Sequence, residues 1–349
     1  MASATGVPLV VEPRSNALRW MDLQPIHLNE LPPHAGIPAE STKSGLTLSA
    51  FLNSVLTEAF EINLDGDEWI SHGRWPGARP DYVKMPPFSG TASDPDINVL
   101  LHVDKRASGK DSSAWLARKS NHSALDIQCS ELDTLLAQDH CRKEAEYTPS
   151  VLEANEILKW SAEDLEKAVA ELKPEWKVGS VQMSIYQMFH EMPKALGLSL
   201  LQNRVFHVLC ITAHSTSPSN SLSLSHTLQL PINFASFASI SSITSKSHIN
   251  PTSLKYNNSG ATDRQKKQNG NKFTEGVYVS LERLCEGSAE GEHRWDMMTK
   301  SDAKGITKIA PWSTRRKETL NAVAEDVKYV LDEIKKRRRA ERRSAGATG

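Results

Sequence analysis

Two stretches of the chain repeat apolar residues at the three- and four-residue spacing of an amphipathic helix. The first follows Gly45, and its apolar residues are Leu48, Phe51, Leu52, Val55, Leu56, Ala59 and Phe60. The second begins near Thr314, and its apolar side carries Leu320, Val323, Val327, Val330, Leu331 and Ile334. Each pattern predicts a helix with one face packed on a core. Residues 130–147 predict a further helix.

Other stretches alternate with the period of two that is typical of a β-strand. In residues 178–189, Val181, Met183 and Ile185 alternate with polar residues, which predicts a strand. Similar patterns predict strands at residues 97–105, 115–123, 276–284 and 293–300. The last two are separated by a Gly-rich segment and predict a hairpin.

Residues 147–160 fit a helix and a strand equally well. Ser161 comes three residues before Asp164, in the spacing of a capping box with Asp in place of Glu or Gln. We therefore expect a short helix to begin at Ser161.

The strand expected at residues 203–212 is apolar on both faces. One face carries Val205, His207, Leu209 and Ile211, and the other carries Phe206, Val208, Cys210 and Thr212. A strand in an outer layer is polar on one side. Both faces here must therefore meet apolar groups, with helices on one side and either more protein or a cavity on the other.

The alternation of apolar and polar residues is weakest at residues 213–271, where serine is the dominant residue. Within this segment, residues 213–262 contain no Asp or Glu. Compact domains rarely hold so long a weakly patterned segment. We expect a disordered insert there, with translated intron sequence and a phosphorylated regulatory loop as alternatives. The chain then divides into an extended N-terminal arm at 1–44, one domain at 45–335 interrupted by the insert, and a disordered basic tail at 336–349.

Composition narrows the class of protein. The 349 residues carry a net charge of −1, which gives no argument for a polyanionic partner. The four cysteines form no C-x-x-C pair, so we predict neither a zinc site nor a disulfide framework. The N-terminus does not resemble a secretory signal, and no window of about 18 apolar residues could span a membrane. We expect a cytoplasmic monomer.

No catalytic or phosphate-binding motif is present. The sequence lacks G-x-G-x-x-G, G-x-x-x-x-G-K-[ST], H-E-x-x-H and G-x-S-x-G. His207 and Cys210 are three residues apart on one expected strand, so they point to opposite faces and cannot act as a base and nucleophile. We predict no catalytic residues, no metal ligands and no cofactor.

Residues 335–343 form a basic run with one acidic residue, Glu341. The simplest interpretation is a solvated helix end, since cations are favourable near a helix C-terminus. A nuclear-localisation patch and transient contact with an anionic membrane surface are the alternatives. The surroundings contain few aromatic residues, which argues against specific nucleic-acid recognition.

Several late segments together resemble a fungal family of START-like proteins of unknown function. They include EYTPSVLEANEILKW from Glu146, the strand ending in MFHEMP at Pro193, LLQNRVF from Leu200, GVYVSLERL from Gly276 and the turn SDAKG from Ser301. The resemblance covers roughly residues 45–212 and 273–335. It implies an α+β helix-grip fold, in which a curved antiparallel sheet wraps a long C-terminal helix around a tunnel for an apolar ligand. The serine-rich insert replaces a strand of that fold, unless residues 230–240 are a degraded version of it.

The resemblance implies binding, transfer or sensing of a lipid or another apolar small molecule. Expected wall residues are Val181, Met183, Ile185, Val205, His207, Leu209, Val277, Val279, Trp295, Met297, Leu320, Val323 and Val327. Tyr186 or Arg204 would meet a polar head group. One alternative is an enzyme on the same scaffold, for which Glu191, His190, His207 and Asp296 are the nearest acid–base candidates. The other is a nuclear or scaffold protein that acts through its basic tail.

Overall fold

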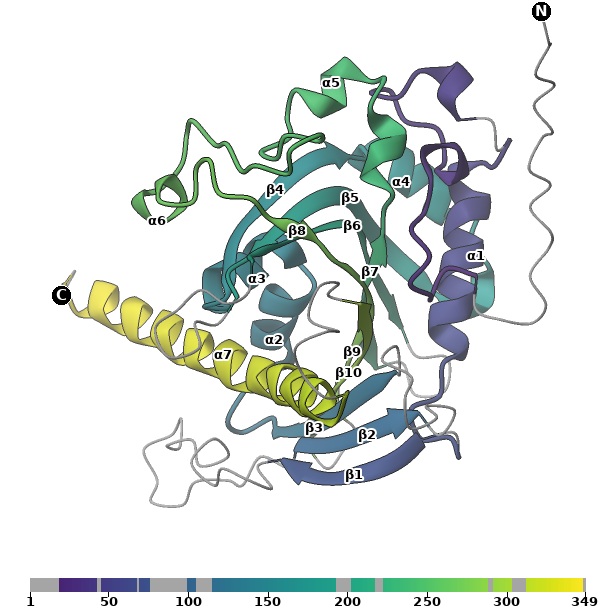
Figure 1. Ribbon diagram of the computed structural model, residues 1–349. Helices are drawn as coiled ribbons and strands as arrows, with labels where there is room; N and C mark the ends of the chain where they lie inside the picture. Colours follow the sequence, from purple (N-terminus) through teal and green to yellow (C-terminus); the bar gives the residue numbers. More distant parts are fainter. Residues whose placement is uncertain are drawn as a thin grey trace, which may run out of the picture.

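The computed structural model describes residues 19–42, 45–67, 69–75, 99–104, 115–192, 202–216, 222–287, 291–302 and 312–347. They form a mixed α+β fold built on one large, curved, antiparallel sheet (Figure 1). Its strands are β1 (Trp69–Trp75), β2 (Val99–Asp104), β3 (Leu116–Ser123), β4 (Val151–Lys159), β5 (Val178–His190), β6 (Arg204–Thr216), β7 (Ser223–Pro231), β9 (Val277–Cys285) and β10 (Glu292–Asp302). They lie in the order β1-β2-β3-β10-β9-β7-β6-β5-β4, and the two-residue strand β8 (Thr274–Glu275) pairs with β6 in parallel.

Helices cover both faces of the sheet. On the face that we call inner lie α2 (Cys129–Leu136), α3 (His140–Tyr147) and the long C-terminal helix α7 (Trp312–Ala347) (Figure 1). The outer face is covered by α1 (Leu48–Glu61), α4 (Ala162–Val169), α5 (Ser241–Thr244) and the 3₁₀ helices η1 (Leu28–Glu30) and η5 (Phe234–Phe237). Three further short helices are η2 (Ala39–Ser41), η4 (Pro174–Trp176) and α6 (Asp263–Lys266).

The alternation within each strand decides which side chains meet these two layers. In β6, Leu209 and Ile211 join the outer core, whereas Val208 and Cys210 pack on the inner side beside Cys141 of α3. Residues that face each other in antiparallel strands share a face of the sheet. The prediction that this strand is apolar on both faces is therefore confirmed, and both faces are covered by protein.

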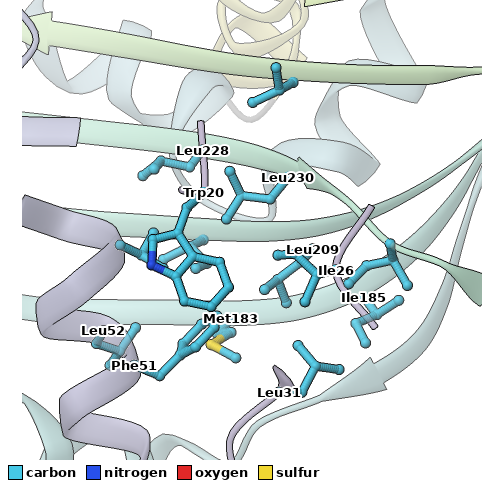
Figure 2. Packing of buried hydrophobic residues seen from close by; sticks show 14 of the residues in the cluster. Trp20, Ile26, Leu31, Phe51, Leu52, Met183, Ile185, Leu209, Leu228 and Leu230 are labelled. Carbon is cyan, nitrogen blue, oxygen red and sulfur yellow. The ribbon is translucent and has the colours of Figure 1, made fainter. Parts of the chain in front are cut away.

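The N-terminal segment belongs to the domain core, which begins well before residue 45. Trp20, Ile26 and Leu31 are buried against the outer face, together with Phe51 of α1 and Met183 of β5 (Figure 2). The Trp20 indole nitrogen donates to Ser54 Oγ at 2.8 Å. Residues 19–42 are thus a packed layer and not an extended arm; residues 1–18 and 43–44 of the expected arm lie outside the described residues.

The expectation of a disordered insert at residues 213–271 is wrong for the described part of that range. β7 lies between β6 and β9 in the middle of the sheet, so the sheet keeps the strand that we expected the insert to replace. After β7, Phe234, Phe237 and Ile243 are buried in the outer core. Burial explains the polar but uncharged residues of β7, where an unpaired charge would be costly, whereas many residues after β7 are exposed.

Residues after α5 protect the free edge of β4. The Lys246 ammonium donates to the Ile157 carbonyl at 3.2 Å, Arg264 Nη1 to the Val151 carbonyl at 3.2 Å, and Gln265 Nε2 to the Leu152 carbonyl at 3.2 Å. Side chains thus satisfy backbone groups that an edge strand would otherwise offer to another chain.

Two helix predictions need correction. Residues 130–147 form two helices, α2 and α3, because the chain turns at Asp139, whose φ of 47° is left-handed. The expected disordered tail is also wrong for residues 336–347, because α7 continues to Ala347; residues 348–349 lie outside the described residues. The other helix and strand predictions are confirmed for the described residues. Residues 147–160, which fit both a helix and a strand, contain β4, and Ser161 Oγ accepts from the Asp164 amide at the start of α4. Among the described residues, no helix is long and apolar enough to cross a membrane.

Candidate functional site

A group of ionisable side chains lies on the inner face, between the sheet and its covering helices. Arg118 of β3 lies opposite Met297 of β10, and Met297 lies opposite Glu282 of β9. The three side chains therefore share the inner face. His140 and Glu144 come from α3, and Asp326 comes from α7. We call Arg118, His140, Glu144, Glu282 and Asp326 the inner polar cluster.

Arg118 is fully buried and connects the sheet to α7. Its Nε donates to the Val323 carbonyl at 2.8 Å, and its Cζ lies 3.7 Å from the centroid of the Trp295 ring. The Trp295 indole nitrogen donates to Glu282 Oε2 at 2.8 Å, and Arg118 Nη2 lies 4.0 Å from the same oxygen. Burial lowers the pKa of Arg118, and Glu282 opposes that change. Arg118 Nη2 is buried and makes no hydrogen bond with the described residues.

His140 is the first residue of α3, and its imidazole ring faces the carboxylates of Glu282 and Glu144. Its Nδ1 lies 2.8 Å from the Leu136 carbonyl oxygen, so Nδ1 must be the protonated nitrogen. Nε2 lies 3.6 Å from Glu282 Oε1 and 3.7 Å from Glu144 Oε2. Burial alone would lower the pKa of His140, but Glu282 and the other acidic groups around it raise it above the usual 6.5. For Glu144, burial raises the pKa.

A hydrogen-bonded chain extends the cluster along the sheet. Gln229 Nε2 donates to Glu144 Oε2 at 3.2 Å and approaches Cys141 Sγ at 3.5 Å, while Ser280 Oγ donates to Gln229 Oε1 at 2.9 Å. Cys141 and Cys210 are buried free thiols. Burial raises the pKa of Cys141, so this thiol stays protonated and is a poor nucleophile.

Three polar side chains at this site have no hydrogen-bond partner in the described part of the chain: Tyr147 of α3, Tyr278 of β9 and Asp326 of α7. Burial raises the pKa of each, and that of Asp326 lies well above the usual 3.8. All three nevertheless keep some accessible surface. They are thus removed from bulk water without being completely packed by protein.

Apolar side chains surround the polar cluster on both sides. Trp295 packs with Leu320, Val327 and Leu331 of α7 and with Leu132 and Leu135 of α2. Towards β4 lie Val151, Tyr186, Met188 and Val208. Half-buried Phe206 and Tyr278 pack edge to face there, with ring centroids 5.0 Å apart. The site is therefore an apolar interior with a few polar groups.

The expected wall residues divide between the two faces. Val181, Met183, Ile185, Leu209 and Val279 belong to the outer core, where Trp20, Phe51 and Leu31 cover them. Val205 packs with Phe189, Tyr256 and Phe273 under residues 245–273, and Val277 is half-buried at the start of β9. Five of the expected wall residues lie on the inner side: Trp295, Met297, Leu320, Val323 and Val327.

The two residues expected to hold a polar head group have partners elsewhere. The Tyr186 hydroxyl donates to Glu156 Oε2 at 2.9 Å, and Arg204 Nη1 donates to the Gln202 carbonyl. His207 stacks on Phe234 with ring centroids 4.5 Å apart, and its Nδ1 lies 3.1 Å from Glu275 Oε1. None of the three belongs to the inner polar cluster.

The acid–base candidates for an enzyme do not converge. Glu191 pairs with Arg264, Asp296 pairs with Arg294 at 2.8 Å, and the buried His190 ring lies beside Phe206. Among the described residues, no group of three His, Cys, Asp or Glu side chains is arranged to hold a metal ion.

The inner polar cluster was missed because its members are distant in sequence. The sequence does contain one signal of this cluster. Asp326 lies three residues after Val323 and four before Val330, within the apolar stripe of α7. A carboxylate in such a stripe indicates a buried polar site. Arg118 and Glu282 occupy inward positions of their strands, but alternation alone did not show which face was inward.

A known family model matches a part of the chain that includes this whole site. The model of a family described as a protein of unknown function, DUF3074, matches residues 115–334. The match starts just before β3 and ends in α7, so it includes all five residues of the inner polar cluster. No curated protein matches the chain. Since the match covers more than half of the sequence, the chain belongs to the DUF3074 family.

Proposed function

We propose that this protein binds a lipid or another apolar small molecule between α7 and the inner face of the sheet, with the polar end of the ligand at the inner polar cluster. The observation that supports this most strongly is the state of Tyr147, Tyr278 and Asp326. Burial raises the pKa of each, yet each keeps accessible surface and lacks a hydrogen-bond partner among the described residues.

From that state we infer a small enclosed space beside these side chains. Bulk water would leave the pKa of Asp326 near its usual value, and complete packing would leave no accessible surface. Buried polar groups normally have partners, because an unmade hydrogen bond costs about 1–3 kcal/mol. A ligand with a hydroxyl, carbonyl or carboxyl group would supply partners for Arg118 Nη2 and for the carboxyl of Asp326.

The surroundings favour an apolar body for the ligand. Phe206, Tyr278 and Met297 are half-buried on the inner side, and burying apolar ligand surface against them is worth about 25 cal/mol per Å². Few polar groups within an apolar lining are typical of small-molecule sites. Methionine suits such a wall because its side chain adapts to different shapes.

The START-like, helix-grip interpretation is part of the same proposal. The curved antiparallel sheet and the long C-terminal helix against its inner face agree with what that resemblance implies. The ligand site then lies on the inner face and not at the outer-face residues expected from the sequence. We propose binding without a chemical step, since the acid–base candidates do not converge.

Two neighbouring methionines of β10 provide a matched test. Met297 is half-buried on the inner face, whereas Met298 is buried in the outer core. Met297→Trp should extend into the proposed space, leave unfolding little changed and abolish uptake of a fluorescent fatty acid, sterol or phospholipid. Met298→Leu conserves volume and should leave uptake unchanged, while Met298→Trp should destabilise the fold by about 1–3 kcal/mol through overpacking.

Two results with the Met297→Trp variant would contradict the proposed ligand site. Normal uptake by a folded Met297→Trp variant would show that the ligand binds elsewhere. A loss of stability in Met297→Trp as large as in Met298→Trp would show that no space exists on the inner face. Either result would overturn the proposal.

A further inference from the structure

The last turns of α7 extend away from the rest of the molecule (Figure 1). Arg337 Nη2 lies 2.8 Å from Glu146 of α3, and Arg338 pairs with Glu131 of α2. These ion pairs hold the helix to the domain and neutralise two of its cations. Beyond them, the described residues 339–345 are exposed.

Three cations of this extension have no ion-pair partner among the described residues: Arg339, Arg342 and Arg343. Their spacing of three and four residues places them on one side of the helix. Glu341 is the one acidic residue in the segment. The arginines therefore present a fixed positive surface, held in place by the ion pairs that precede it.

An exposed leucine lies at the same end of the molecule. Leu125, in the turn between β3 and α2, is 95% exposed. The next residue, Asp126, lies close enough to Arg338 to raise the pKa of its guanidinium, and Glu131 six residues on pairs with Arg338. Leu125 is thus near the point at which α7 leaves the domain.

We propose that this end docks on an anionic lipid surface, with Arg339, Arg342 and Arg343 against the head groups and Leu125 inserted between them. Positive charge beside an exposed apolar side chain matches the two layers of such a surface. A nucleic acid is the less favoured partner, because residues 335–347 contain no aromatic side chain on which a base could stack. The proposal does not depend on a ligand beneath α7.

The test uses the full chain and sedimentation with phosphatidylcholine vesicles, with and without phosphatidylserine. Each unpaired arginine near the surface contributes about 1 kcal/mol, so R339A/R342A/R343A should weaken binding to the anionic vesicles by roughly a hundredfold at low salt. The control K255A/K267A/K272A removes the same charge from exposed lysines elsewhere and should bind normally. High salt should release the wild type from the vesicles.

Leu125→Ser keeps the charge and should weaken vesicle binding several-fold; unchanged binding would overturn the part assigned to Leu125. The whole proposal is overturned if the wild type does not bind anionic vesicles, or if the arginine and lysine variants weaken binding equally. It is also overturned if duplex DNA binds the wild type more tightly than anionic vesicles do and R339A/R342A/R343A loses that DNA binding. Thermal unfolding of each variant confirms that it is folded.

Discussion

The guanidinium of Arg118 stacks on the indole of Trp295, with 3.7 Å between Cζ and the ring centroid, while the indole nitrogen donates to Glu282. The aromatic ring thereby contacts both members of a buried charge pair. Such a pair is costly to remove from water unless each charge keeps strong partners. The arrangement places a cation, a carboxylate and a hydrogen-bond donor at one point beneath α7.

Removing the positive charge of Arg118 should leave the buried carboxylate of Glu282 without a counter-charge. We expect Arg118→Met to lower the free energy of unfolding by about 3–5 kcal/mol, as when one partner of a buried pair is deleted. R118M/E282Q should lose less than the sum of the two single variants, because neither charge remains. Urea unfolding of the four proteins measures this coupling, and strictly additive losses would show that the two charges do not interact.

Asp326 should make stability depend on pH. Its folded-state pKa is raised above the usual 3.8, so the folded state binds more protons than the unfolded state, and stability falls as the pH rises from about 3.8 through the folded-state pKa. Asp326→Asn removes this loss. We expect the ligand-free variant to be more stable than wild type by on the order of 1 kcal/mol at about pH 8, and to lose that advantage at about pH 4. The same difference at both pH values would count against a desolvated Asp326.

His214 of β6 and Asp133 of α2 should give a separate pH effect. His214 Nε2 lies 3.0 Å from Asp133 Oδ1, and this hydrogen bond raises the pKa of His214 above 6.5. The resulting stabilisation is complete below about pH 6.5 and is lost as the pH rises through the folded-state pKa. His214→Gln should therefore cost about 1 kcal/mol at about pH 5.5 and much less at about pH 8.5. Thermal unfolding across this range is the measurement, and a cost independent of pH would refute the charged pair.

The serine-rich segment should contribute to stability through Phe237. This side chain is 1% exposed and packs on Phe234 at 5.9 Å between ring centroids. Phe237→Ala should cost about 3–5 kcal/mol in urea unfolding. Ser239, two residues away, is exposed, and Ser239→Ala should change stability by less than about 0.5 kcal/mol. If the segment were a disordered insert, both substitutions would be neutral.

Much of the sheet could be predicted from local pattern. The alternation in β5, the doubly apolar β6 and the hairpin of β9 and β10 agree with the structure, because burial imposes a period of two on each strand. The sequence pattern did not predict β7, and the reason is physical. Ser225, Thr227 and Gln229 of this central strand lie on the inner face of the sheet. There, hydrogen bonds such as that from Thr227 Oγ1 to the Leu136 carbonyl at 2.9 Å replace apolar packing. A serine-rich composition then looks disordered although the strand is buried.

The candidate site was harder to predict because its residues come from distant parts of the chain. Arg118 and Asp326 are brought together only by the packing of α7 across β3, which no local pattern encodes. Alternation also defines two faces without showing which one a helix covers. This is why Met183 and Leu209 were expected to line the ligand site, although Trp20 and Phe51 of the outer core cover them.

Native mass spectrometry of the protein purified from a eukaryotic host tests the central claim most directly. The account predicts a stoichiometric adduct of an apolar molecule, which disappears on denaturation, is recovered by organic extraction, and is absent from a folded Met297→Trp variant. A protein that carries no adduct and takes up no fluorescent fatty acid, sterol or phospholipid would contradict a ligand site beneath α7.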